Sequence, residues 1–128
     1  MKKSIAILVL FLLVVVGVFA QSQPRRGVYT NSAGLEMGIS PLPGRIGVYH
    51  ISMIYGRVGD WSSVEVYNME GRIVGNRLEV VMTWVNQKAL ADLGVYNIHT
   101  GDTGTMTIVS NTQIRGADGN LWVWNRDV

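Results

Sequence analysis

Short runs in which apolar and polar side chains often alternate recur along the chain from Gly27 onward, and Gly, Asn, Asp or Pro separates each run from the next. A period of two is the pattern of a half-buried β-strand, and the separating residues are those that form turns. The pattern predicts strands near Gly27–Thr30, Leu35–Ser40, Ile46–Arg57, Val64–Tyr67, Gly71–Val74, Leu78–Val85, Val95–His99, Thr105–Val109, Gln113–Arg115 and Leu121–Asn125. Short strands at regular spacing are typical of an all-β sandwich or barrel.

Alternation also assigns side chains to the two faces of a strand. Within the run Leu78–Val85, one face carries Leu78, Val80, Met82 and Trp84. We therefore expect Trp84 to be buried. Gly75-Asn76 between two apolar runs predicts a two-residue hairpin, and Lys88–Leu93 is the one segment with the pattern of a helical turn, which we expect to be a connector.

The first twenty residues have a different pattern. Lys2 and Lys3 precede an apolar run, Ile5–Phe19, that carries no charge, and Val18-Phe19-Ala20 ends this run with a permissive residue at −3 and a small residue at −1 of a cleavage site. This pattern predicts a secretory signal peptide over residues 1–20, cut after Ala20. The alternative is a retained membrane anchor, but the run is shorter than the roughly 20 residues that span a bilayer.

Export predicts a periplasmic or secreted protein with a flexible lead-in over residues 21–26 and one domain over residues 27–128. The mature chain would not span a membrane. Of the eleven Lys and Arg residues, two leave with the leader, so that nine remain against nine Asp and Glu. A mature chain without net charge gives no reason to expect a nucleic-acid partner. The absence of cysteine excludes disulfides, thiolate metal ligands and a lipid-modified N-terminal cysteine.

The order of the short motifs is similar to that of small lipocalin-like and avidin-like barrels, the calycin type. The chain opens with Gly27-Val28-Tyr29, continues with Gly47-Val48-Tyr49, has a middle hairpin over Gly71–Leu78 followed by Trp84, and closes with Leu121–Trp124. The resemblance implies an all-β, antiparallel, closed or nearly closed barrel of about eight strands. The sequence departs from lipocalins in having Tyr29 where they have Trp and in lacking their paired cysteines, and no avidin ligand set can be matched.

The chain has few groups that could carry out catalysis. His50 and His99 are the only histidines, no short metal-binding spacing occurs, and there is no nucleophile elbow or phosphate-binding loop. Carboxylates such as Glu70 and Glu79 occur singly within strands, and the aspartates at 102 and 118 are explained by turns. We therefore expect no enzymatic activity, no cofactor and no metal.

The aromatic residues, four Trp and five Tyr, point to a ligand instead. An apolar, aromatic-lined barrel interior can hold one small hydrophobic or aromatic ligand, or its own side chains can fill it. For the first case the predicted lining is Tyr49, Met53, Tyr67, Met82, Trp84 and Trp122, with His50 or Arg45 orienting the ligand. For the second case we expect a structural or inhibitory module that binds another protein of the cell envelope, with Trp61 as its anchor.

Overall fold

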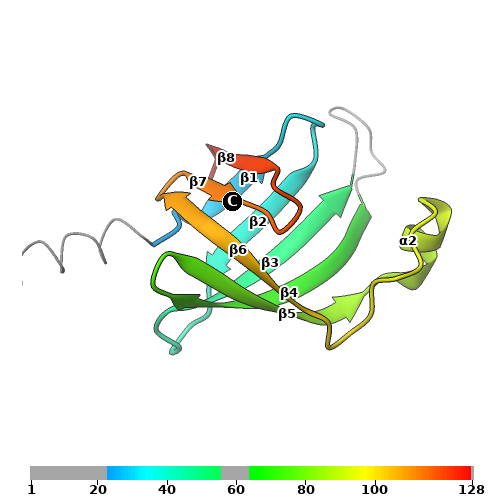
Figure 1. Ribbon diagram of the computed structural model, residues 1–128, viewed down its shortest axis with the longest axis horizontal. Coiled ribbons are helices and arrows are strands. Elements are labelled where there is room, and N and C mark those ends of the chain that lie inside the picture. Colours follow the sequence, from blue (N-terminus) through cyan, green and yellow to red (C-terminus); the bar gives the residue numbers. More distant parts are fainter. Residues whose placement is uncertain (1–22, 56–63, 128) are drawn as a thin grey trace, which may run out of the picture.

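The computed structural model describes residues 23–55 and 64–127, which form one closed barrel of eight strands (Figure 1). The strands are β1 (Gly27–Thr30), β2 (Glu36–Pro41), β3 (Val48–Tyr55), β4 (Val64–Val74), β5 (Arg77–Val85), β6 (Thr103–Ser110), β7 (Gln113–Arg115) and β8 (Leu121–Arg126). A short helix, α2 (Gln87–Asp92), lies between β5 and β6. The predicted leader and Trp61 lie outside the described residues.

Each strand pairs antiparallel with the next, and β8 returns to pair with β1. The prediction of an all-β, antiparallel, closed barrel is therefore confirmed. The hairpin at Gly75-Asn76 is also confirmed: Gly75 has a φ of 64°, which suits the first position of a type II′ turn. Among the described residues, no helix is long and apolar enough to cross a bilayer.

Three of the predicted strands differ from the structure. Val64–Tyr67 and Gly71–Val74 are parts of the single strand β4, because the intervening residues Asn68–Glu70 pair with β3 on one side and with β5 on the other. Val95–His99 is not a strand. It follows α2 as an irregular connector, in which the Val95 N–H donates to the carbonyl oxygen of Leu90 at 2.8 Å.

The expected burial of Trp84 is also wrong: its exposed fraction is 44%. Met69 pairs with Met82, but the next residue of β4, Asn68, pairs with Trp84, so that Thr83 is an extra residue in β5. Such a bulge reverses the alternation beyond it. Trp84 therefore shares the outer face with Asn68, and Val85 shares the inner face with Tyr67.

One end of the barrel is closed by packing. The segment 23–26 crosses this end, where the Arg25 N–H donates to the carbonyl oxygen of Asn111 at 2.7 Å and the Arg25 guanidinium lies 3.8 Å from the centre of the Trp124 ring. The Tyr29 hydroxyl donates to the carbonyl oxygen of Arg25 at 2.6 Å. The largest fully buried side chains of the interior are Tyr29, Met37, Ile39, Ile51, Leu78 and Ile114.

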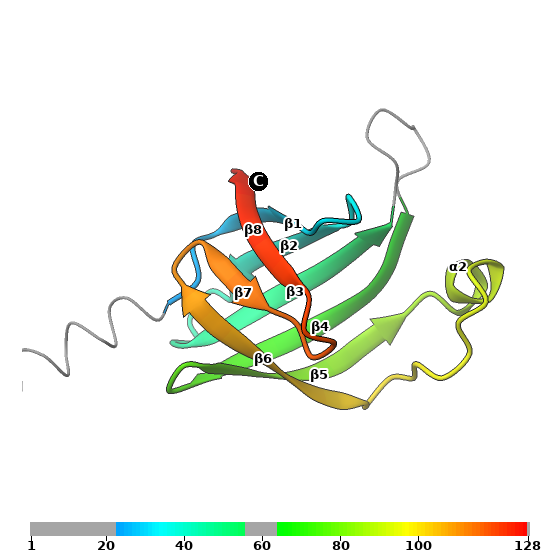
Figure 2. The same cartoon turned by 45° about the horizontal axis from the view of Figure 1, so that its top comes forward.

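The opposite end carries the connections after β1, β5 and β7, and α2 lies beyond the ends of β4 and β5 there (Figure 2). Asn86 ties α2 to the barrel. Its side-chain oxygen accepts the Ala89 N–H at 3.1 Å as an N-cap, and its own N–H donates to the carbonyl oxygen of Val66 at 2.8 Å. Leu90 is the buried residue of this helix. The two ends of the barrel are therefore built differently.

Candidate functional site: an apolar cavity at the α2 end

A cavity of about 580 Å³ opens at the end of the barrel that carries α2. Every strand from β3 to β6 contributes to it, together with β8, α2 and three connections. The larger apolar residues that line it are Leu35, Met53, Val66, Tyr67, Met69, Val80, Met82, Leu90, Leu93, Val95, Ile98, Met106 and Trp122. The polar residues that line it are Asn31, Asp102, Thr103, Asp118 and Asn120.

Four methionines form a band around the inner wall, one from each of the consecutive strands β3, β4, β5 and β6: Met53, Met69, Met82 and Met106. Met69 and Met82 are direct cross-strand partners, so they share the inner face. Methionine has three rotatable bonds and a polarizable sulfur, and it adapts to irregular shapes. This wall can therefore change its surface to fit an apolar guest without a change in the backbone.

Two aromatic side chains complete the apolar wall. Trp122 is buried and pairs across the sheet with Ile114, which belongs to the core at the closed end. Tyr67 pairs with Met53 and with Val85. Burial raises the pKa of the Tyr67 hydroxyl above its ordinary value of 10.0, and the nearby Asp118 carboxylate raises this pKa further. Tyr67 is therefore a neutral hydroxyl at physiological pH, beside a carboxylate.

Four of the five polar residues belong to connections at the mouth of the cavity, and the fifth, Thr103, is the first residue of β6. Asn31 closes the turn after β1, where its side-chain oxygen accepts the N–H groups of Ala33 and Leu35. Asp118 organises the turn before β8, where it accepts the backbone N–H of Asn120 at 3.0 Å. The cavity is therefore apolar in its depth and polar at its rim.

The segment 93–102 closes one side of the cavity. Leu93, Val95 and Ile98 line it, as Leu90 of α2 does. The segment rejoins the barrel at Met82 through two hydrogen bonds. The N–H of Gly101 donates to the carbonyl oxygen of Met82 at 2.8 Å, and the N–H of Met82 donates to the carbonyl oxygen of Asp102 at 2.8 Å. Leu93, Val95 and Ile98 thus face the cavity instead of forming part of a strand.

Of the six residues predicted to line a ligand cavity, four are brought together: Met53, Tyr67, Met82 and Trp122. Trp84 lies on the outer face because of the bulge at Thr83. Tyr49 points inward but belongs to the closed half, where it pairs with Gly71 and is part of the packed core. Burial raises the pKa of Tyr49.

Sequence reasoning missed Met69, Met106 and Leu90. Met69 falls between two of the predicted strands, and the unbroken alternation from Tyr67 through Met69 to Gly71 is the signal that identifies it as an inward residue. Met106 occupies an inner position of a correctly predicted strand. Leu90 carries no such signal, since its position depends on how the connector packs.

The polar residues proposed to orient a ligand lie elsewhere. His50 is on the outer face of β3, where its Nε2 lies 3.0 Å from the hydroxyl of Ser52. Arg45 precedes β3 and forms an ion pair with Glu70. Neither side chain lines the cavity.

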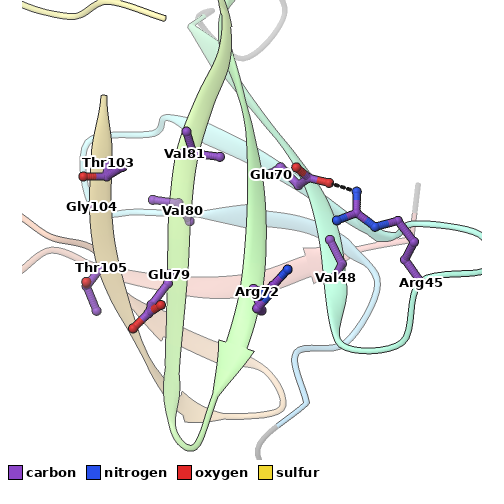
Figure 3. Close-up of a pocket in the computed structure, with 10 residues that line it drawn as sticks. All are labelled: Arg45, Val48, Glu70, Arg72, Glu79, Val80, Val81, Thr103, Gly104 and Thr105. Atoms are coloured by element: carbon purple, nitrogen blue, oxygen red, sulfur yellow. Dashed lines mark hydrogen bonds and ion pairs between the residues drawn. The ribbon is translucent and has the colours of Figure 1, made fainter. Parts of the chain in front are cut away.

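Arg45 and Glu70 instead belong to a second hollow, of about 420 Å³, on the outer wall over β3 to β6 (Figure 3). Arg72 and Glu79 are cross-strand partners in the same wall, and Thr103 and Thr105 border it on β6. The charges of this hollow alternate in sign, and one of its two carboxylates is engaged by Arg45. This arrangement is typical of a solvated strand face, so the interior cavity is the stronger candidate for a site.

Within residues 23–55 and 64–127, no three His, Cys, Asp or Glu side chains come together in a group that could hold a metal ion. No protein-family model, no curated protein and no solved structure matches this chain. The case for its function therefore depends on the geometry of the cavity.

Proposed function

We propose that this protein is an exported, non-enzymatic barrel that binds a small hydrophobic or aromatic ligand in the cavity at the α2 end. The observation that carries the proposal is the cavity itself: about 580 Å³ of space with an apolar depth and a polar rim. Ligand pockets in proteins typically measure about 300–1,000 Å³ and combine apolar walls with a few polar groups. A barrel that served only as a scaffold would gain stability by filling this space.

Binding would be driven by burial of the apolar surface of the ligand against the four methionines, Tyr67 and Trp122. These side chains are held by a closed barrel, so little ordering of the backbone is needed when a ligand enters. The neutral Tyr67 hydroxyl and the groups at the rim would orient a polar end of the ligand. Export to the periplasm or the cell exterior is supported by the leader pattern of residues 1–20.

The closed eight-stranded meander is compatible with the calycin-type barrels that the sequence resembles. We propose membership of that broad architectural group on the basis of strand number and order together with the glycine and aromatic motifs. The proposal of ligand binding does not depend on this kinship, because a function has to be argued from the site itself.

Two strand glycines provide a matched test of the cavity. Gly104 faces the interior, and a Cβ added there would lie 3.6 Å from Val80, an ordinary contact. Gly38 pairs with Ser52 on the outer face, where a Cβ would lie 4.0 Å from the Ser52 Cβ. Gly104→Leu therefore fills the cavity, whereas Gly38→Leu adds the same side chain outside the barrel.

The measurement is saturable fluorescence enhancement of N-phenyl-1-naphthylamine, an uncharged apolar probe. We expect the parent protein and Gly38→Leu to bind one probe per chain. Gly104→Leu should bind the probe at least about tenfold more weakly, because the new side chain takes up space in which the probe would bury apolar surface. A tenfold loss of affinity corresponds to about 1.4 kcal/mol of lost binding free energy. Equal binding by the two leucine variants, with both still folded, would show that the probe binds outside the cavity.

A further inference from the structure

The rim of the cavity carries charge of one sign. Asp102 and Asp118 come from two different connections, and the other polar residues of the rim are uncharged: Asn31, Thr103 and Asn120. No Lys, Arg or His is among the described residues that line the cavity. Arg115, which precedes the turn that carries Asp118, donates from its guanidinium to the carbonyl oxygen of Gly119 at 2.9 Å and does not line the cavity.

Both carboxylates are held in place by backbone groups of their own turns, and neither forms an ion pair with an arginine or a lysine among the described residues; the Nδ1 atom of His99 lies 3.9 Å from a carboxylate oxygen of Asp102. Asp102 accepts the backbone N–H of His99 at 2.8 Å, and Asp118 accepts both the N–H and the side-chain amide of Asn120. On the wall of the barrel the situation differs, since Glu36 is paired with Arg126 and Glu70 with Arg45. The charge at the rim is thus positioned but not neutralised by an arginine or a lysine among the described residues.

The apolar wall below the rim is also favourable to positive charge. Tyr67 and Trp122 line the same cavity as the two aspartates, and Asp118 is close enough to Tyr67 to raise the pKa of its hydroxyl. The faces of tyrosine and tryptophan rings attract cations, and aromatic pockets are a common means of holding an ammonium group. Two independent features, the rim charge and the aromatic wall, therefore favour the same kind of guest.

We propose that the cavity selects a lipophilic cation, a molecule with an apolar body and an amine or quaternary ammonium head. The body would lie against the methionine wall, and the head would lie at the mouth between Asp102 and Asp118. This inference rests on the proposed function of the cavity and gives it a ligand class. An anionic amphiphile such as a fatty acid would place its carboxylate against two like charges, which disfavours it.

The test compares three ten-carbon competitors, each below its micellar concentration, that displace N-phenyl-1-naphthylamine from the purified protein: decyltrimethylammonium, 1-decanol and decanoate. The chain is the same in all three, so differences report the head group. At low salt we expect the cation to displace the probe at a concentration about tenfold or more below that of decanoate, the size expected for charges a few ångströms apart near a protein surface. The preference should shrink as salt is added.

Paired variants locate the source of the preference. Asp102→Asn with Asp118→Asn removes both rim charges while keeping oxygen acceptors for the turns, and the ratio of cation to anion affinity should fall to about one, as Coulomb attraction is lost. Glu79→Gln with Asp127→Asn changes the net charge equally at two residues that do not line the cavity, and it should leave the ratio as in the parent protein.

The outcomes separate the two proposals. If the probe and decanol bind but decanoate competes as well as the cation, or if the rim variant keeps the full preference, the cavity binds ligands and the cation proposal is wrong. If neither the uncharged probe nor decanol binds the parent protein, the proposed function itself fails, and the cation proposal fails with it.

Discussion

The two ends of this barrel share their strands but differ in what occupies the space between them. At the closed end, the segment 23–26 crosses the opening, and large side chains such as Tyr29, Ile51 and Leu78 are fully buried. At the α2 end, the same strands carry methionines around open space, and the polar groups stand at the rim. The packed side chains at the closed end thus stabilise the barrel, which allows the half of the interior at the α2 end to remain unfilled.

The largest effect that the comparison predicts is a difference between core truncations in the two halves. Leu78 is fully buried, so Leu78→Ala leaves a new void and should lower the free energy of unfolding by about 2–5 kcal/mol. Met53 is partly exposed on an existing cavity, so Met53→Ala should cost about 1 kcal/mol or less. Chemical denaturation of both variants measures the difference, and equal losses would mean that the two halves are packed alike.

A second prediction concerns the pH dependence of stability at the closed end, where Tyr29 is buried. Burial raises the pKa of Tyr29 to about 12, above its ordinary value of 10.0. Between these values the unfolded chain releases the hydroxyl proton and the folded chain retains it, so the unfolded state binds fewer protons and stability falls as pH rises. The contribution of the protonated Tyr29 hydroxyl to the free energy of unfolding is fully present below pH 10 and is lost as the pH rises toward 12.

Tyr29→Phe tests this account. The variant loses the hydrogen bond to the carbonyl oxygen of Arg25, which should cost about 1 kcal/mol at neutral pH. It also lacks the titrating group, so its stability should decline less steeply than that of the parent protein above pH 10. Parallel decline of the two proteins in denaturation series at several alkaline pH values would remove Tyr29 from the explanation.

The smallest expected effect concerns the outer wall near the cavity. Trp84 is displaced to the outer face by the bulge at Thr83, so Trp84→Ala should lower the free energy of unfolding by about 1 kcal/mol or less, as for other exposed positions. A buried tryptophan would cost about 3–5 kcal/mol. Thermal unfolding of the variant distinguishes the two values, and a large loss would place the indole inside the barrel.

The barrel could be predicted from the sequence because its determinants are local. Alternation and turn residues give the bounds of Gly27–Thr30 and Gln113–Arg115 as the structure has them, and they give the hairpin at Gly75-Asn76. They fail where pairing with neighbours overrides the local pattern. The polar residues Asn68 and Glu70 made β4 look like two strands, and the bulge at Thr83 exists only in the register between β4 and β5.

The candidate site was predictable to the extent that it lies on strands. Met53, Tyr67, Met82 and Trp122 follow from alternation, which places inward residues on one face. Whether those residues surround a space or fill it depends on distant segments. Leu90 and the connector after α2 line the cavity, and their packing against the barrel is a tertiary contact that no local pattern encodes.

The central claim, that a ligand enters the open half and not the closed half, can be tested most directly with the methionine methyl groups. The chain has six methionines, of which Met53, Met69, Met82 and Met106 line the cavity and Met37 is fully buried in the core. In a titration of ¹³C-methyl-labelled protein with N-phenyl-1-naphthylamine, the four cavity methyl resonances should shift and saturate together, while that of Met37 stays in place. Unchanged cavity resonances at saturating probe, or shifts confined to Met37, would contradict the account.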